Sequence, residues 1–164
     1  MAKLPEAPQA DSAFWKFWEL GTSGHATLYR LTKGRIGGKY QGAPVALVDS
    51  VGRKSGKRRT HPLLCTEDGE NLVIVASKGG VNRHPAWYHN LMANSETKAN
   101  WYGDVRQVRA REVEGAERER LWARMVEAYP TYEAYQRRTD RRIPVVVLEP
   151  VPELSCGEAD SGNL

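Results

Sequence analysis

The order of the apolar runs along the chain is the feature that most constrains its fold. Short runs rich in β-branched residues alternate with turns that contain Gly and Asp, and the clearest amphipathic helix comes late in the chain. A parallel α/β sheet needs a helix after each strand, so this order argues against a βαβ nucleotide-binding sheet. It predicts instead a small, mainly antiparallel barrel of about six strands with helices packed outside it.

Hydrophobic periodicity and turn residues place the individual elements. The strands are expected at 45–48, 63–65, 71–76, 97–101, 105–113 and 143–149, and the helices at 14–20, near 28–31, 86–92, 117–129 and 131–138. Residues 1–24 are interpreted as an aromatic amphipathic helix with its linker, 25–150 as the barrel domain, and 151–164 as a disordered polar tail.

A cationic stretch between the first two strands is the strongest functional signal. Arg53, Lys54, Lys57, Arg58 and Arg59 follow one another closely, with Gly52 and Gly56 among them. Such a density of like charge disfavours folding unless an anion joins it, and glycine lets backbone N–H groups approach a ligand. A solvated basic hairpin is the simpler alternative. The spacing excludes a Walker loop, and the Rossmann glycine fingerprint is absent.

Composition narrows the class of protein further. The chain of 164 residues carries a net charge of +4, which predicts an acidic ligand, nucleic acid or an anionic membrane surface as partner. Cys65 and Cys156 give no disulfide framework, and His84 and His89 lack the spacing of metal ligands, so we expect no metal. Without a signal peptide or a long apolar run, the expectation is a soluble cytoplasmic protein.

Several segments occur in the order found in one known family. They are Gly52-Arg53-Lys54-Ser55-Gly56, Arg59-Thr60-His61-Pro62-Leu63, Ala76-Ser77-Lys78-Gly79-Gly80, His84 to Leu91, Tyr129-Pro130 with Tyr132, and Arg138-Thr139-Asp140-Arg141 with Ile143-Pro144-Val145. Over 29–150 the chain resembles the deazaflavin (F420)-dependent nitroreductase family of actinobacteria. The resemblance implies a split β-barrel of the flavin-reductase type and hydride transfer from reduced F420 to a quinone, a nitroaromatic or an activated enone.

The resemblance also implies roles for particular residues. Tyr132 and Ser77 would support the developing charge or the proton, and Tyr129, Tyr135 and Trp87 would line the substrate pocket. The cofactor would contact Arg53, Lys54, Ser55, Arg59, Thr60, His61, Pro62, Leu63, Leu64, Val75, Ala76, Ser77, Lys78, Ala86, Trp87, Tyr88, His89, Asn90 and Tyr132. The phosphate and glutamate tail of F420 would account for the cationic stretch. Neighbouring cations should disfavour protonation of His61.

Structural roles are the alternative for several of these residues. The three tyrosines could fill a core, Trp87 could be a core residue, and Ser77 could belong to a turn. At the level of function, the alternatives are an FMN-dependent oxidoreductase on the same barrel, a non-catalytic F420 carrier, and a nucleic-acid-binding module with Trp101, Tyr102 and Arg106 as a stacking face. The aromatic N-terminal segment is compatible with a lid, a homodimer interface or peripheral contact with the inner face of the cell membrane.

Overall fold

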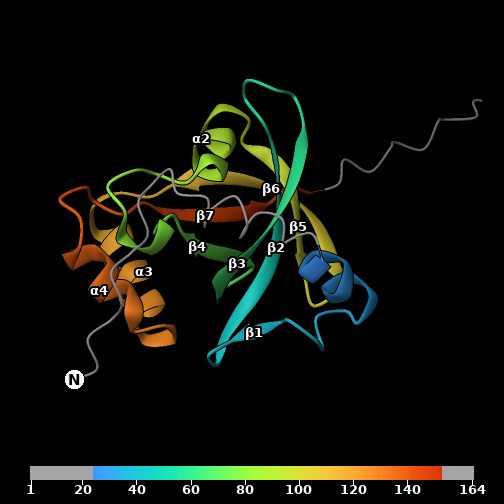
Figure 1. Cartoon of the computed structure of the whole chain (residues 1–164), viewed down its shortest axis with the longest axis horizontal. Coiled ribbons are helices and arrows are strands. Elements are labelled where there is room, and N and C mark those ends of the chain that lie inside the picture. Colours follow the sequence, from blue (N-terminus) through green and yellow to red (C-terminus); the bar gives the residue numbers. More distant parts are fainter. Residues whose placement is uncertain (1–23, 153–164) are drawn as a thin grey trace, which may run out of the picture.

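The computed structural model of the chain describes residues 24–152. These residues form one antiparallel sheet of the strands β1 (Lys39–Tyr40), β2 (Ala43–Val51), β3 (Arg58–Asp68), β4 (Asn71–Val75), β5 (Glu96–Trp101), β6 (Asp104–Glu112) and β7 (Val145–Pro150) (Figure 1). The order β2-β3-β4-β7-β6-β5 closes on itself because β5 also pairs with β2. The expected six-stranded antiparallel barrel is therefore confirmed.

Closure of the barrel is uneven. β2 and β3 pair over seven residues each, from Val45↔Leu64 to Val51↔Arg58. β2 and β5 pair at two positions, Leu47↔Asn100 and Val48↔Ala99. The short β2–β5 seam leaves the barrel partly split. Within the part of the chain that the structure describes, no helix has both the length and the apolar character to cross a bilayer.

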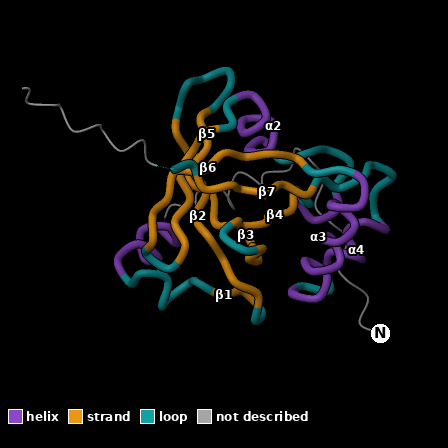
Figure 2. The backbone as a smooth tube through the Cα atoms, turned by 180° about the vertical axis from the view of Figure 1, so that it is seen from behind, coloured by secondary structure: helices purple, strands orange, loops and turns teal. Residues whose placement is uncertain are grey.

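The helices cover the barrel from outside and from one end (Figure 2). α2 (Ala86–Ala93) follows a short 3-10 turn, η1 (Lys78–Gly80). α3 (Gly115–Ala128) packs on β3, β4 and β7, and α4 (Thr131–Arg137) packs on α3 and on η1. A further helix at residues 24–31 packs on β2, where Tyr29 is fully buried and donates to the carbonyl oxygen of Val45 at 2.9 Å.

Alternation along each strand divides the core in two. One set of side chains fills the barrel interior, with contributions from all six barrel strands and from Trp87 and Leu91 of α2. The other set lies between the barrel wall and α3 and α4, and includes Val73, Val145 and Met125. β4 and β7 contribute side chains to both sets, so both of their faces are buried, which explains why their sequences are continuous apolar runs.

Most predicted elements are present, but their limits differ. β3 begins at Arg58, five residues before the predicted strand at 63–65, because its charged residues pair with β2 at Ser50↔Arg59 and Val51↔Arg58. An apolar-run criterion misses a strand end whose side chains are exposed. β1 was not predicted. The predicted helix at 14–20 and most of the predicted tail at 151–164 lie outside the described residues.

Candidate functional site: a cationic hairpin and an aromatic cluster joined by β3

The cationic stretch forms the hairpin between β2 and β3, at the top of Figure 1. The amide of Gly52 donates to Lys57 O at 2.9 Å, and the amide of Gly56 donates to Gly52 O at 2.7 Å. Gly56 has φ +65°, where glycine is favoured, and a Cβ at Gly52 would approach Ser55 Oγ to 2.5 Å and the guanidinium of Arg59 to 3.0 Å. The two backbone hydrogen bonds and the two glycines therefore form a compact loop in which the guanidinium of Arg59 lies close to the backbone of Gly52.

The charges of this hairpin are almost uncompensated. Arg53, Lys54, Lys57 and Arg59 are exposed, and within residues 24–152 none of them lies within 4 Å of a carboxylate. Among the described residues, Arg58 is the one hairpin cation with an acidic neighbour, Asp49, at 3.8 Å. Elsewhere on the barrel, arginines such as Arg111 and Arg120 are paired with carboxylates at 2.8–2.9 Å. This local excess of positive charge is what an anionic ligand would neutralise.

A buried polar chain lies beneath the hairpin. Asn90 of α2 accepts a hydrogen bond from the backbone amide of Arg53 at 3.1 Å, and its amide nitrogen is 3.4 Å from Ser50 Oγ. Ser50 Oγ lies 2.9 Å from Nε2 of His61. Burial, reinforced by the positive charge of Arg59, lowers the pKa of His61 to about 4. The predicted direction of this shift is confirmed, but burial rather than the cations is its larger cause.

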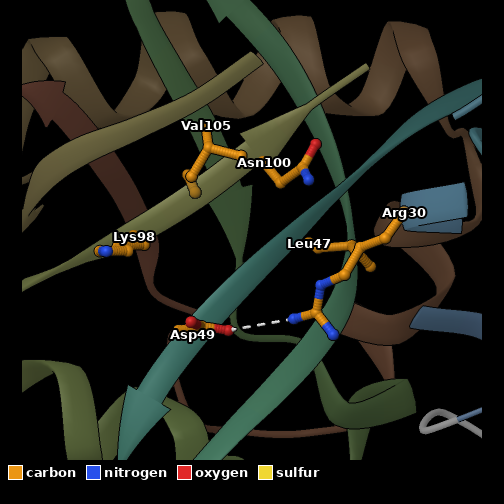
Figure 3. Close-up of a pocket in the computed structure, with 7 residues that line it drawn as sticks. Arg30, Leu47, Asp49, Lys98, Asn100 and Val105 are labelled. Atoms are coloured by element: carbon orange, nitrogen blue, oxygen red, sulfur yellow. Dashed lines mark ion pairs between the residues drawn. The ribbon is translucent and has the colours of Figure 1, made fainter. Parts of the chain in front are cut away.

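Residues 60–64 present alternate side chains to opposite faces of β3. His61 and Leu63 face the barrel interior, whereas Thr60 faces outward, where it donates to Asp49 Oδ1 at 2.6 Å and accepts from Arg30 at 2.8 Å. The two partners of Thr60, Arg30 and Asp49, line an outer cleft at the β2–β5 seam (Figure 3), and its other lining residues are Leu47, Lys98, Ala99, Asn100 and Val105. This cleft contains none of the residues predicted for the site.

The segment after β4 is held in an unusual backbone conformation. Lys78, Gly79 and Gly80 all have positive φ values, of 46°, 65° and 78°. A Cβ at Gly80 would come within 2.5 Å of Tyr135 O, so glycine allows α4 to pack directly on this turn. Ser77 and Lys78 of the predicted site are thereby fixed beside α4.

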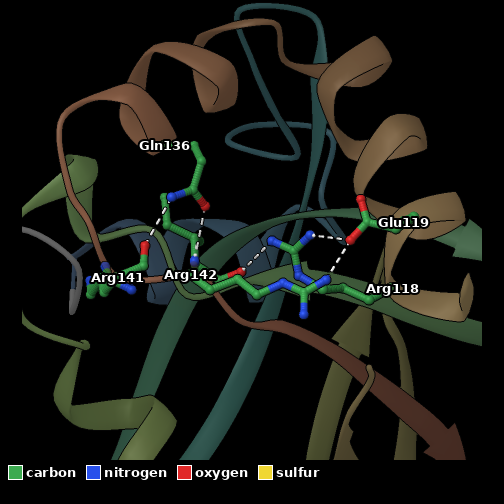
Figure 4. A network of polar contacts seen from close by, with 6 residues as sticks. Arg118, Glu119, Gln136, Arg141 and Arg142 are labelled. Carbon is green, nitrogen blue, oxygen red and sulfur yellow. Dashed lines mark hydrogen bonds and ion pairs between the residues drawn. The ribbon is translucent and has the colours of Figure 1, made fainter. Parts of the chain in front are cut away.

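Arg141 holds this segment in place. Its guanidinium donates to the carbonyl oxygens of Ser77 at 2.7 Å, Val81 at 2.9 Å and Ala76 at 3.2 Å, and lies 3.0 Å from Nδ1 of His84. The backbone of Arg141 is fixed in turn, because its carbonyl oxygen accepts from Gln136 of α4 at 2.9 Å (Figure 4). Arg141 belongs to a quoted sequence segment, but its role was not predicted, since its partners lie about sixty residues away.

The three predicted site tyrosines form one aromatic cluster at the α3–α4 junction. Tyr129, Tyr132 and Tyr135 have ring centroids 5.2–6.4 Å apart, and Tyr40 of β1 lies 6.2 Å from Tyr129 at the exposed edge. Tyr132 is only 4% exposed, and burial raises its pKa above the ordinary phenol value. Burial and a side-chain hydrogen bond to Tyr129 likewise raise the pKa of Tyr135.

The α2 residues of the predicted site lie inside or at the end of the barrel. Trp87 is 8% exposed and belongs to the interior core. Tyr88 donates to Glu112 at 2.6 Å, and burial with this bond raises its pKa to about 12. His84, Tyr88 and His89 form a ring cluster with centroid distances of 4.8–5.6 Å. The assignment of Trp87 to a substrate pocket stays a prediction.

The structure thus places the predicted residues in two groups. The cationic hairpin and α2 lie together at one end of β3, while α4 and the aromatic cluster lie on another side of the barrel (Figures 1 and 2). Leu64, which packs against the outer core that includes Tyr129 and Tyr132, lies about 17 Å along β3 from Arg59. A ligand that contacts both groups must therefore be elongated, with an anionic end at the hairpin. The sequence analysis did not predict four residues that contact the predicted site residues in the structure, namely Asp49, Ser50, His84 and Arg141.

Trp101, Tyr102 and Arg106, considered above as a nucleic-acid stacking face, are engaged within the fold. Trp101 packs against the barrel core, Tyr102 donates to Gly38 O at 2.9 Å, and Arg106 pairs with Asp104 at 2.6 Å. The aromatic and cationic groups that such a face needs already have partners in the structure.

The fold and these contacts define a split β-barrel protein with a cationic hairpin between β2 and β3. Residues 22–150 match the model of the F420H(2)-dependent quinone reductase family, and the chain belongs to that family. The F420H(2)-dependent quinone reductase Rv1261c of Mycobacterium tuberculosis is 43% identical over 128 residues, which cover 76% of this chain and 86% of the relative.

Two solved structures extend the similarity to the fold. An F420-H2 dependent reductase, FDR-A, is 46% identical with a TM-score of 0.61, covering 65% of this chain and 94% of that chain. A structure described as a domain-swapped dimer is 40% identical with a TM-score of 0.63, covering 79% and 98%. F420H2 is the cofactor of the family to which this chain belongs, as the resemblance in the sequence implied.

Proposed function

We propose that this chain binds F420H2 and catalyses the transfer of its hydride to a quinone. The observation that carries the proposal is the hairpin with four exposed cations that lack an acidic partner within residues 24–152. Nitroaromatics and activated enones are further candidate acceptors, but the family model favours a quinone. Bound F420H2 supplies the hydride, and the protein supplies binding, orientation and electrostatic stabilisation.

The hairpin fits the anionic part of F420. A phosphate and several glutamates need more positive charge than one phosphate group alone, and the loop offers Arg53, Lys54, Lys57 and Arg59 on one short segment. A charge-assisted hydrogen bond contributes about 1.5–3 kcal/mol, whereas an exposed ion pair contributes about 0–1 kcal/mol. We therefore assign most of the affinity to Arg53, Lys54, Ser55 and Arg59 at the phosphate, and less to the glutamate contacts.

The remaining site residues would orient the ring and the acceptor. Backbone groups of β3 between Thr60 and Leu64 would follow the cofactor from the hairpin toward the aromatic cluster. Ser77 and Tyr132 are the proposed hydrogen-bond donors to the charge that develops on the acceptor. Tyr132 suits this role because a phenol is protonated at neutral pH and can donate a hydrogen bond, and burial, which raises its pKa, favours hydrogen bonding over release of the proton. Tyr129, Tyr135 and Trp87 would line the acceptor pocket.

Titration with F420 and with FMN tests the cofactor assignment. The expected result is F420 binding that weakens with added salt, and FMN binding that is at least tenfold weaker. Micromolar affinity for FMN without affinity for F420 would instead support an FMN-dependent oxidoreductase. Tight F420 binding without turnover of any quinone, nitroaromatic or enone would support a carrier.

We further propose that the protein acts in the cytoplasm and contacts the inner face of the cell membrane. Leu31 and Ile36 are 79% and 52% exposed, and Lys33 and Arg35 lie close to them in sequence. Exposed apolar side chains flanked by cations suit an anionic lipid surface. Leu31→Glu should reduce sedimentation with phosphatidylglycerol vesicles at least threefold, while Gln107→Glu, with the same charge change on exposed β6, should not. Equal sedimentation of the two variants would reject the membrane proposal.

A homodimer is the oligomeric state that we propose, supported by the relative described as a domain-swapped dimer. Light scattering of the purified chain tests it. A mass of one chain at micromolar concentration would contradict this proposal.

A further inference from the structure

Asn90 occupies a place in the fold that differs from that of a ligand contact. It is 7% exposed, and both polar atoms of its carboxamide have protein partners. Oδ1 accepts from the Arg53 amide at 3.1 Å, and Nδ2 is 3.4 Å from Ser50 Oγ. Among the described residues, Asn90 is the one side chain from outside the loop that forms a hydrogen bond with a group of residues 52–57, and that group is the Arg53 amide. Asn90 therefore ties α2 to the hairpin.

The Arg53 amide fixes the orientation of the Asn90 carboxamide. A backbone N–H can only donate, so Asn90 Oδ1 is the acceptor facing the loop, and Nδ2 is turned toward Ser50 Oγ, to which it donates at 3.4 Å. Ser50 Oγ in turn shares a hydrogen bond with His61 Nε2 at 2.9 Å, so the carboxamide is held between the loop and a buried polar pair. Ser50 is 1% exposed, which keeps water from competing for these bonds.

The hairpin needs such a tether because its cations repel one another. Arg53, Lys54, Lys57 and Arg59 have no compensating carboxylate within residues 24–152, so a free loop would spread them apart. A ligand that bound the spread loop would have to order it, which weakens binding. A loop already fixed to α2 presents its cations together before any anion arrives.

We propose that Asn90 is a positioning residue that fixes the cationic hairpin through the Arg53 amide and does not itself contact the cofactor. This inference rests on the proposed function and replaces the assignment of Asn90 to the cofactor-contact set. Asn90→Ala should weaken F420 binding about threefold to tenfold, the range expected for one hydrogen bond.

A double-mutant cycle separates positioning from direct contact. Arg53→Ala with Lys54→Ala removes two cations but keeps the Arg53 backbone amide to which Asn90 binds. If Asn90 acts by positioning the loop cations, adding Asn90→Ala in that background, where Lys57 and Arg59 alone remain to be positioned, should weaken F420 binding clearly less than Asn90→Ala does in the wild-type background. The same threefold to tenfold loss in both backgrounds would contradict positioning of Arg53 and Lys54 through Asn90 and overturn the proposal.

Hydrogen exchange of the cofactor-free protein tests the tether without F420. Asn90→Ala should speed amide exchange at 53–57 about tenfold or more, and Ser50→Ala, which leaves the Arg53 bond but frees the carboxamide, should have a smaller effect. Asn100→Ala is the matched control: it removes an Asn acceptor from the Gly103 amide, 2.9 Å away at the β5–β6 turn, and should leave 53–57 unchanged.

Hydrogen exchange and F420 binding test different parts of the proposal. Unchanged exchange at 53–57 in folded Asn90→Ala would overturn the tether, whatever the cofactor is. If Asn90→Ala does not fold, unchanged exchange at 53–57 in Ser50→Ala would overturn it. Absence of F420 binding by the wild-type chain would overturn the proposed function and the cofactor role of the tether, while exchange would still decide whether Asn90 orders the loop.

Discussion

Removing two cations from the hairpin should weaken cofactor binding strongly without harming the fold. Arg53 and Lys54 are exposed, and neither has an acidic partner within residues 24–152, so Arg53→Ala with Lys54→Ala relieves repulsion and breaks no ion pair. The melting temperature should stay the same or rise slightly. If one of the two side chains makes a charge-assisted bond to the phosphate and the other an exposed ion pair, the loss of binding free energy is about 2–4 kcal/mol, or about 30- to 1000-fold in dissociation constant.

The assay is a fluorescence titration of F420 at low and at high salt. At 1 M salt the Debye length falls to about 3 Å, so the loss should shrink to about tenfold or less. Arg109→Ala with Arg137→Ala is the matched control, because it lowers net charge by the same amount at sites where the arginines pair with Glu96 and Glu133. An unchanged dissociation constant at low salt, or an equal loss in the control, would refute the assignment of the hairpin to anion binding.

Three further predictions follow from buried groups. Because the pKa of His61 is lowered to about 4, the unfolded chain binds a proton between pH 6.5 and 4 that the native state does not bind. The wild-type protein should therefore lose up to about 3 kcal/mol of stability as pH falls through this window, and His61→Asn should lack that loss. Parallel pH profiles of the two proteins in chemical denaturation would contradict this prediction. Arg141→Lys should lose bonds to the carbonyl oxygens of the 76–81 segment, costing about 2 kcal/mol in thermal unfolding and speeding proteolysis there; wild-type stability would show that the clamp is dispensable. Tyr132→Phe should slow single-turnover oxidation of bound F420H2 about 5- to 150-fold with little change in cofactor affinity, and equal rates would remove Tyr132 from the chemistry.

The sequence predicted the barrel because local patterns determine strands and hairpins. Alternation and turn residues located β4 to β7, and the glycine-bounded cationic stretch located the hairpin. The same patterns missed the full length of β3, where Arg58 and Arg59 continue the ladder with exposed side chains. Closure through β2 and β5 also has no local signal, since Val48 and Ala99 are paired only in the folded chain.

The site was predicted less completely because its contacts are distant along the chain. Arg53 and Asn90 are 37 residues apart, and Arg141 binds carbonyl oxygens some 60 residues before it. Neither pair leaves a periodic pattern. Residue type alone also does not show burial. Tyr132, expected to support the developing charge or the proton, is 4% exposed within an aromatic cluster, so its catalytic role stays a prediction.

The most direct test of the proposed function is anaerobic mixing of the protein and stoichiometric F420H2 with a soluble quinone, followed by the fluorescence of oxidised F420. We predict one rapid turnover, with protein-dependent oxidation at least a hundredfold faster than in the protein-free mixture. Oxidation at the protein-free rate, with F420H2 shown to be bound, would contradict the assignment of this chain as an F420H2-dependent quinone reductase.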